Sequence, residues 1–177
     1  MKPSDNIFLV GMMGAGKTTV GKILARRLKR RFVDSDHEIE RRCGVRIPVI
    51  FDIEGEEGFR GREVQAIAEV AALDGVVLAT GGGAVLSAEN RRRLASRGTT
   101  VYLHARPEDL HRRLRHDKGR PLLNTPDPLQ RLRDLYAVRD PLYRQVADIV
   151  VDTGTQSVQA LARELLSKIE ERCRVSA

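Results

Sequence analysis

Short apolar runs alternate with longer stretches of mixed apolar and polar residues along this chain. The short runs are typical of strands buried on both faces of a sheet, and the longer stretches have the apolar spacing of helices. Strands are expected at residues 6–10, 31–34, 76–80, 100–104 and 148–152. Helices are expected at residues 19–28, 35–42, 48–53, 56–73, 88–96, 107–115, 128–144 and 156–173. This alternation predicts an α/β fold in which helices cover both faces of a parallel sheet.

Local signals refine two of these boundaries. Ser35 is expected to cap the helix after the second strand, with Glu38 as its capping-box partner. The charged segment 116–124 contains Gly119 and Pro121 and is predicted to be a mobile loop. There is no internal repeat, low-complexity stretch or linker, and at 177 residues we expect one domain.

The strongest chemical signal is Gly11-Met-Met-Gly-Ala-Gly-Lys-Thr18, a complete G-x-x-x-x-G-K-[ST] pattern between a predicted strand and a predicted helix. Glycine lets the backbone wrap around an anion, and the N–H groups of the loop and the helix dipole then favour phosphate. Lys17 would reach the β- and γ-phosphates of a nucleotide, and the Thr18 hydroxyl could bind Mg²⁺. An ordinary glycine-rich turn is a poor alternative, because both flanking segments fit.

Further polar groups follow other predicted strands, where ligands of parallel sheets bind. Asp34 and Asp36 could hold Mg²⁺ through water and orient an acceptor hydroxyl, although a turn and helix cap explain them equally well. Arg60 could grip a carboxylate, but a solvated helix face is the better interpretation of that residue alone. Arg120 on the predicted loop could neutralise a transferring phosphoryl group. For Arg139, as for Arg120, a solvated arginine is the alternative.

Three consecutive glycines, Gly81 to Gly83, follow the third predicted strand. They would offer free N–H groups and a close approach of backbone to ligand, and they are more than a simple turn requires.

Charge and composition narrow the function class. The chain has 31 basic and 24 acidic residues, a formal net charge of +7, and only 4% aromatic residues. Its arginine clusters lie near predicted helix C-termini, where the helix dipole favours cations, and no aromatic residues are interleaved to stack on bases. The charge therefore favours an enzyme of small anions over a nucleic-acid-binding protein.

Cys43 and Cys173 are far apart and, like the four histidines, lack metal-ligand spacing, so neither a zinc site nor a disulfide framework is expected. The first apolar stretch runs directly into the glycine-rich loop and does not resemble a signal peptide, and no run is long enough to cross a membrane. We therefore expect a cytoplasmic location and no membrane partner.

Taken together, these segments resemble the shikimate kinases over nearly the whole chain. The resemblance rests on the order and spacing of Gly11–Thr18, Asp34-Ser-Asp36, Phe51–Arg60 with Glu63, Gly81–Gly83, Arg120-Pro-Leu-Leu123, and Arg139 with Leu142-Tyr143. It implies a three-layer P-loop kinase of the nucleoside-monophosphate-kinase type with strand order 2-3-1-4-5. One domain would span residues 1–177, with an acceptor-binding region near 35–63 and a mobile lid near 112–124.

The resemblance also implies ATP and shikimate as substrates, Mg²⁺ as cofactor, and phosphorylation of the shikimate 3-hydroxyl in aromatic amino-acid biosynthesis. It implies the following residue roles: Lys17, Asp36 and Arg120 in catalysis; Gly14, Ala15, Gly16, Lys17, Thr18, Thr19, Arg120 and Gln156 in ATP binding; Asp36, Arg60, Gly82 and Arg139 in shikimate binding; Thr18 and Asp34 near Mg²⁺. Arg113 and Arg115 both qualify as the arginine that stacks on adenine. Val49 stands where many relatives are expected to have tryptophan. A monomer that binds no nucleic acid is expected.

Other functions explain fewer of these residues. Another small-molecule kinase of this fold, such as a gluconate or nucleotide kinase, is the nearest alternative, and the paired arginines with an aspartate favour a hydroxy acid. A GTPase would need an [NT]-K-x-D segment, which is missing, since Lys118 lies between Asp117 and Gly119. A nucleic-acid-binding protein would show steeply salt-dependent binding but would leave the acceptor residues unexplained.

Overall fold

The computed structural model of the protein describes residues 6–175, apart from the side chains of Cys173 and Val175. Five strands form one parallel sheet: β1 (Ile7–Val10), β2 (Arg31–Asp34), β3 (Val76–Ala79), β4 (Thr99–His104) and β5 (Ile149–Asp152). Their order is β2-β3-β1-β4-β5, with Ile7 opposite Val77 on β3 and Thr99 on β4. The predicted parallel sheet and its strand order are confirmed.

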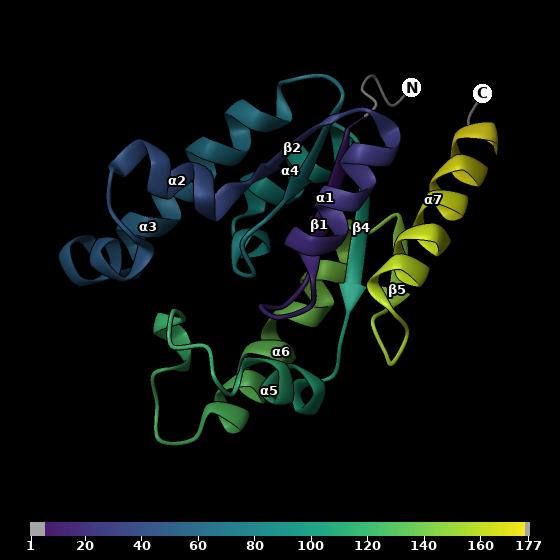
Figure 1. Ribbon diagram of the computed structural model, residues 1–177. Coiled ribbons are helices and arrows are strands. Elements are labelled where there is room, and N and C mark those ends of the chain that lie inside the picture. The colour runs from purple at the N-terminus through teal and green to yellow at the C-terminus, as the bar shows by residue number, and fades with distance from the viewer. Residues whose placement is uncertain (1–5, 176–177) are drawn as a thin grey trace.

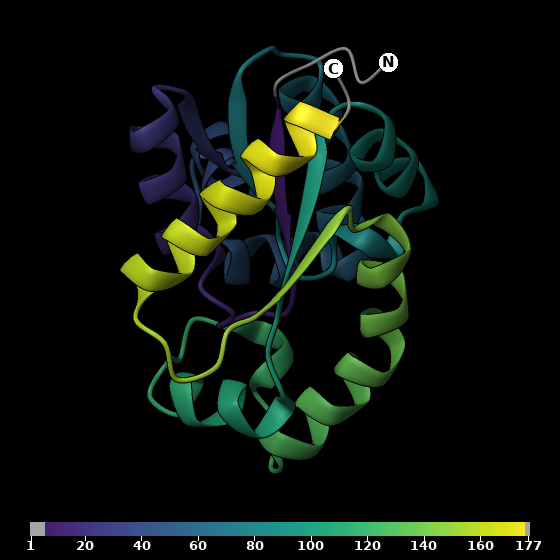
Figure 2. The ribbon, with the colours of Figure 1, turned by 90° about the vertical axis from the view of Figure 1, so that its right-hand side faces the viewer.

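Within the described residues, seven α-helices connect or follow the strands: α1 (Lys17–Leu28), α2 (Ser35–Cys43), α3 (Ile47–Ala71), α4 (Ala88–Ser96), α5 (Pro107–Leu114), α6 (Pro128–Val146) and α7 (Val158–Val175). Short 3₁₀ turns lie at Ala84–Leu86 (η1) and Pro121–Leu123 (η2). Helices α1 and α7 pack together on one face of the sheet, and α4 packs against α3 and α6 on the other (Figures 1 and 2). The three-layer prediction is therefore confirmed.

The core is aliphatic because the central strands are covered on both faces. All four residues of β1 and all four of β3 are buried, as their uninterrupted apolar sequences predict. Asn6 is also buried, and its side chain ties β1 to the adjacent layer: the amide donates to the Leu73 carbonyl at 2.6 Å and accepts from Val76 N–H at 2.9 Å. No helix in residues 6–175 is long and apolar enough to cross a membrane.

The expected break between the helices at 48–53 and 56–73 is confirmed: within α3, Gly55 at φ +70° is non-helical and separates two helical stretches. Several other predicted boundaries differ from those of the structure. Residues 121–123 of the expected loop form the 3₁₀ turn η2. Helix α1 begins at Lys17, before the expected Thr19, because Gly16 at φ +94° already turns the backbone into the helix.

Parallel strands bring their following loops to one edge of the sheet. The phosphate loop after β1, Asp34 at the end of β2 and the glycines after β3 meet there. Helices α2 and α3 flank this edge on one side, and α5 and α6, with the segment 115–127 between them, flank it on the other (Figure 1). Two adjoining clefts lie between these elements.

Candidate active site

The phosphate loop places Lys17 at the first position of α1. Its Nζ donates hydrogen bonds to the carbonyl oxygens of Gly11 at 2.7 Å and Met12 at 2.8 Å, so the side chain folds back over its own loop. Burial lowers the pKa of Lys17 to about 8, although the carboxylates of Asp36 and Asp34 partly oppose that shift. With Gly14, Gly16, Thr18 and Thr19, Lys17 lines the larger of the two clefts, here called the nucleotide cleft.

Asp34 links the end of β2 to both the phosphate loop and α2. Its Oδ2 accepts the Thr18 hydroxyl proton at 2.5 Å, and its Oδ1 accepts the backbone N–H of Asp36 at 3.0 Å and of His37 at 3.2 Å. Asp34 is therefore the N-cap of α2.

The expected capping box is wrong. Ser35 lies inside the first turn of α2, and its Oγ accepts the Gly81 N–H at 2.9 Å. Glu38 binds Arg41 and Arg42 instead of the helix start, because its carboxylate finds two guanidinium groups three and four residues on. Ser35 thereby holds the start of the three-glycine segment.

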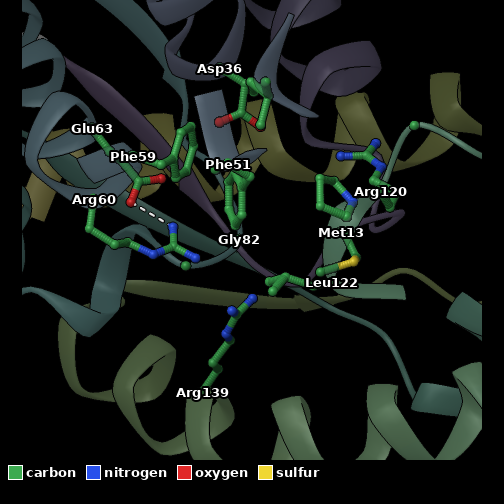
Figure 3. Close-up of a pocket in the computed structure, with 15 residues that line it drawn as sticks. Met13, Asp36, Phe51, Phe59, Arg60, Glu63, Gly82, Arg120, Leu122 and Arg139 are labelled. Atoms are coloured by element: carbon green, nitrogen blue, oxygen red, sulfur yellow. Dashed lines mark hydrogen bonds and ion pairs between the residues drawn. The ribbon is translucent and has the colours of Figure 1, made fainter. Parts of the chain in front are cut away.

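The second cleft, here called the acceptor pocket, collects charged side chains from several elements (Figure 3). Asp36 comes from α2, Arg60 and Glu63 from α3, and Arg139 from α6. The remaining lining is Met13, Ile47, Phe51, Phe59, Gly81, Gly82, Gly83, Gly119, Arg120, Pro121 and Leu122. Four predicted acceptor residues, Asp36, Arg60, Gly82 and Arg139, are thus brought together.

Arg60 is held in the pocket by an ion pair with Glu63. The Arg60 Nη1 lies 2.8 Å from Glu63 Oε2, and Nη2 lies 3.3 Å from Glu56 Oε1 (Figure 3). Burial acts to lower the pKa of Arg60, but the pair with Glu63 outweighs it and raises the pKa. The solvated-face alternative for Arg60 is therefore wrong, because its main partner, Glu63, is only 1% exposed.

Arg139 approaches from the opposite side of the pocket, on α6 (Figure 3). It is 1% exposed, which excludes a solvated arginine, and its Nη1 has no hydrogen-bond partner within the described residues. Burial lowers its pKa. A buried guanidinium with a free donor is suited to bind an anionic group that enters the pocket.

Asp36 completes the charge pattern. Burial, followed by the nearby Asp34 carboxylate, raises the pKa of Asp36, and its Oδ1 has no hydrogen-bond partner among the described residues. A buried carboxylate with a raised pKa and a free oxygen can accept a proton from a bound hydroxyl.

The glycine segment makes room for these side chains. A Cβ at Gly81 would lie 2.6 Å from Glu63 Oε1 and 2.7 Å from Asp36 Oδ1. A Cβ at Gly83 would lie 2.3 Å from the Arg60 guanidinium. Gly82 lies beside Arg139, since its Cβ would meet Arg139 Nη1 at 3.4 Å. A side chain at Gly81 or Gly83 would therefore displace the charged groups of Asp36, Glu63 or Arg60 from their present positions.

Arg120 lines both clefts. Its Nε lies 3.1 Å from Asp117 Oδ2, and Asp117 Oδ1 also accepts the Gly119 N–H at 2.8 Å. Arg120 therefore lies at the boundary where a phosphoryl group would pass from nucleotide to acceptor.

Arg113 and Arg115 lie in different surroundings. Arg113 lines the nucleotide cleft and donates to the carbonyls of Gly14 at 3.2 Å and Thr153 at 2.5 Å. Arg115 lines a separate hollow with residues of α3 and α6. Gln156 is exposed, and its side chain donates to the Asp152 carbonyl and to Glu164; it is not among the residues that line the nucleotide cleft.

Some site residues had no role in the sequence-based interpretation. Glu63 belongs to the family motif and is three residues from Arg60 on the same helix, but its burial depends on tertiary packing. Phe51 and Phe59 form an aromatic wall with ring centroids 4.9 Å apart. Val49 is 38% exposed and is not among the residues that line the pocket. Ala15 is buried in the phosphate loop, and its N–H donates to the Met12 carbonyl at 3.2 Å.

Comparison with known proteins decides the family. The family model described as shikimate kinase matches residues 13–170. The chain belongs to the shikimate kinase family. A shikimate kinase of Ralstonia nicotianae is 61% identical over 166 residues, which cover 94% of this chain and 87% of that protein. The structure of an Acinetobacter baumannii shikimate kinase in complex with shikimate has a TM-score of 0.93 and 50% identity, covering 97% of this chain and 96% of that one.

The fold extends beyond shikimate kinases. A gluconokinase from Sinorhizobium meliloti has a TM-score of 0.58 at 17% identity, over 96% of this chain and 93% of that one. At that identity the likeness shows the fold alone, so the choice among acceptors rests on the closer relatives and on the pocket.

Proposed function

We propose that this protein transfers the γ-phosphoryl group of ATP to the 3-hydroxyl of shikimate. The observation that carries the proposal is the acceptor pocket itself. Two arginines from different helices converge on it together with a buried carboxylate, and it adjoins the nucleotide cleft through Arg120. This pattern fits an acceptor that has one carboxylate and several hydroxyl groups.

Each charged group has a separate task in this proposal. Arg60 and Arg139 bind the acceptor carboxylate from two sides, and a backbone contact from Gly82 fixes the ring. Asp36 binds the ring hydroxyls and accepts the proton of the attacking one, while Lys17 and Arg120 neutralise charge on the phosphates. Most of the rate acceleration then comes from positioning and charge stabilisation.

The residues around Asp34 fit Mg²⁺. Thr18 and Asp34 provide a hydroxyl and a carboxylate in direct contact, and oxygen donors are those that Mg²⁺ prefers. Within residues 6–175 no group of three or more His, Cys, Asp or Glu could hold a metal, which suits an ion bound mainly by nucleotide phosphates. When bound, the ion would neutralise charge on the β- and γ-phosphates.

The remaining ATP contacts follow the phosphate loop. We propose that Gly14, Ala15 and Gly16 supply backbone N–H groups and that Thr18 and Thr19 bind phosphate oxygens. Arg113 would stack on adenine, since it lies against Gly14 and Thr153. The expected contact of Gln156 with ATP would have to come from its backbone. The lid near 112–124 would close over both substrates.

An assay of ADP release tests the proposal. The purified protein is incubated with ATP, Mg²⁺ and one acceptor at a time: shikimate, gluconate or a nucleoside monophosphate. We expect turnover with shikimate only. The Lys17→Ala variant should lose nearly all turnover while keeping its fold, and turnover within a few-fold of the parent would contradict its role. Comparable turnover with gluconate or a nucleotide would overturn the assigned acceptor.

A double cycle tests the carboxylate clamp. Arg60→Lys keeps the charge but loses the planar fork, so kcat/KM for shikimate should fall about tenfold or more while the KM for ATP changes little. An analogue with a carboxamide should lose a similar amount with the parent and much less with the variant. Additive losses would mean that Arg60 does not bind the carboxylate.

Oligomeric state and location remain predictions. We propose an active monomer, which size-exclusion chromatography of the active enzyme tests. Cytoplasmic location is tested by fractionation, and the absence of nucleic-acid binding by a salt titration with DNA.

A further inference from the structure

Tyr143 is fully buried on α6, one turn after Arg139, and its hydroxyl donates a hydrogen bond to the Gly82 carbonyl. Burial raises the pKa of Tyr143, which keeps the hydroxyl protonated as a donor. Gly82 in turn lies beside Arg139, since a Cβ on Gly82 would meet Arg139 Nη1 at 3.4 Å. The Tyr143 hydroxyl thus binds a peptide that lies next to one of the arginines proposed to bind the acceptor.

The Gly82 carbonyl has a special position in the glycine segment. The Gly81 carbonyl accepts the N–H of Ala84 at 3.1 Å, and the Gly83 carbonyl accepts the N–H of Leu86 at 3.0 Å. The Gly82 carbonyl is the one of the three that is bound by a side chain. Because glycine lies on both sides of this peptide, little in the backbone itself resists its rotation.

We infer that Tyr143 is a positioning residue for the acceptor pocket: its hydroxyl fixes the Gly82–Gly83 peptide, which lies beside Arg139, in the orientation that receives the acceptor. The Gly82 carbonyl and the Gly83 N–H share one peptide plane, so the hydroxyl determines both directions. Ser35 holds the other end of the segment through the Gly81 N–H. The two side chains together fix the segment from opposite layers of the fold.

Tyr102, whose ring packs against that of Tyr143 in a tilted arrangement, provides a matched control. Tyr102 on β4 is equally buried, and the two rings lie 4.9 Å apart. The Tyr102 hydroxyl donates to Asp140 at 2.8 Å and does not line the acceptor pocket. Tyr143→Phe and Tyr102→Phe therefore each remove one buried hydroxyl from the same aromatic pair, but only the first touches Gly82.

The inference rests on the proposed function, because the pocket is assigned to shikimate there. With Tyr143→Phe we expect the KM for shikimate to rise about tenfold and the KM for ATP to stay within twofold of the parent. With Tyr102→Phe both KM values should stay near those of the parent, even if the melting temperature falls as much. Equal effects of the two substitutions on the shikimate KM, or none, would overturn the inference.

A second measurement does not depend on turnover. In protein labelled with ¹⁵N-glycine, Tyr143→Phe should shift the Gly83 amide signal of the free enzyme, and Tyr102→Phe should not. An unshifted Gly83 signal would contradict the inference. A parent enzyme inactive on shikimate would instead contradict the proposed function, whatever the glycine signals show.

Discussion

At the scale of single residues, the surroundings of Lys17 make its charge sensitive to pH. Its ammonium group is bound by two loop carbonyls, yet burial lowers its pKa to about 8. Phosphate oxygens would favour the charged form, so binding ATP must raise this pKa. Above about pH 8 the free enzyme has lost the proton, and binding has to take one up.

ATP affinity should therefore be nearly constant from pH 6.5 to 7.5 and fall as pH rises through 8 and beyond, by up to about tenfold per pH unit. Calorimetric titration with ATP at a series of pH values measures this. Lys17→Arg, which stays charged, should remove the dependence between pH 7.5 and 9. A parent affinity that is flat up to pH 9.5 would contradict the shift.

Gly83 lies directly against the Arg60 guanidinium and leaves no free space for a side chain. An alanine Cβ there would collide with the Arg60 guanidinium, which is the free end of a flexible side chain and can move away. Gly83→Ala should leave the melting temperature nearly unchanged but raise the KM for shikimate about tenfold, because Arg60 leaves Glu63. Gly61→Ala on the same helix as Arg60, where a Cβ meets open space, is the control. A normal shikimate KM for Gly83→Ala would show that Arg60 need not lie where it does.

The residues of the site were predictable in identity but not in their partners. The glycines of the phosphate loop and Lys17 follow from a motif with a local chemical reason, whereas the roles of Asp36, Arg60 and Arg139 came from the resemblance to a family. The contact of Tyr143 with Gly82 joins residues of different elements, and no local pattern in one sequence indicates such a pair. The burial of Glu63 likewise depends on packing between elements. For Arg60 and Arg139 the local pattern favoured solvated side chains, since nothing in it shows that tertiary packing will bury them.

At the scale of elements, α5 joins the phosphate loop to the turn after β5. Arg113 in its last turn donates to the Gly14 carbonyl and to Thr153, and the adjacent Leu114 side chain packs directly against Gly14. Two residues later in sequence, Arg115 already lies in a different hollow. The helix thus directs only one of the two candidate arginines into the nucleotide cleft.

Arg113→Ala should therefore raise the KM for ATP about tenfold or more and leave the KM for shikimate nearly unchanged. Arg115→Ala, which removes the same charge from the same region, should change the KM for ATP less than twofold. Steady-state kinetics with each substrate varied in turn distinguishes the two. A larger ATP effect from Arg115→Ala would reverse the assignment.

Element boundaries were predicted correctly where a single local sequence signal dominates. The strands and most helices follow from apolar periodicity. The N-cap of α2 was placed one residue late, at Ser35 instead of Asp34, because serine and aspartate are both good caps. The bend at Gly55 was foreseen as a break between helices, because glycine tolerates the positive φ found there.

At the scale of the whole molecule, the parallel sheet brings opposite charges into one buried site. The order β2-β3-β1-β4-β5 places the ends of β2 and β3 beside the phosphate loop, so Asp36 lies close to Lys17. This strand order was predicted from the resemblance to a family. Apolar periodicity alone predicts parallel strands but does not say which strands are neighbours in the sheet. The site therefore requires the complete fold.

Burial makes the charged form of Asp36 unfavourable in the folded state, which raises its pKa above the unfolded value. Between these two pKa values the folded protein binds more protons than the unfolded chain. The free energy of unfolding therefore falls as pH rises from the unfolded pKa through the folded pKa. At pH 7 the charged Asp36 side chain thus lowers the stability of the folded state.

Asp36→Asn keeps the shape of the side chain, removes its charge and removes the group proposed to accept the hydroxyl proton. It should raise the melting temperature at pH 7 while kcat falls about a hundredfold or more and ATP binding is retained.

The gain in melting temperature should disappear at low pH, where the parent carboxyl is already protonated. Thermal unfolding of parent and variant at pH 4 and pH 7, with kcat measured from pH 6 to 9, tests both halves. A variant that is less stable than the parent at pH 7 would contradict the burial cost. A variant that keeps the parental kcat across pH 6–9 would mean that Asp36 serves only the start of helix α2, and the proton acceptor would have to be sought elsewhere in the acceptor pocket.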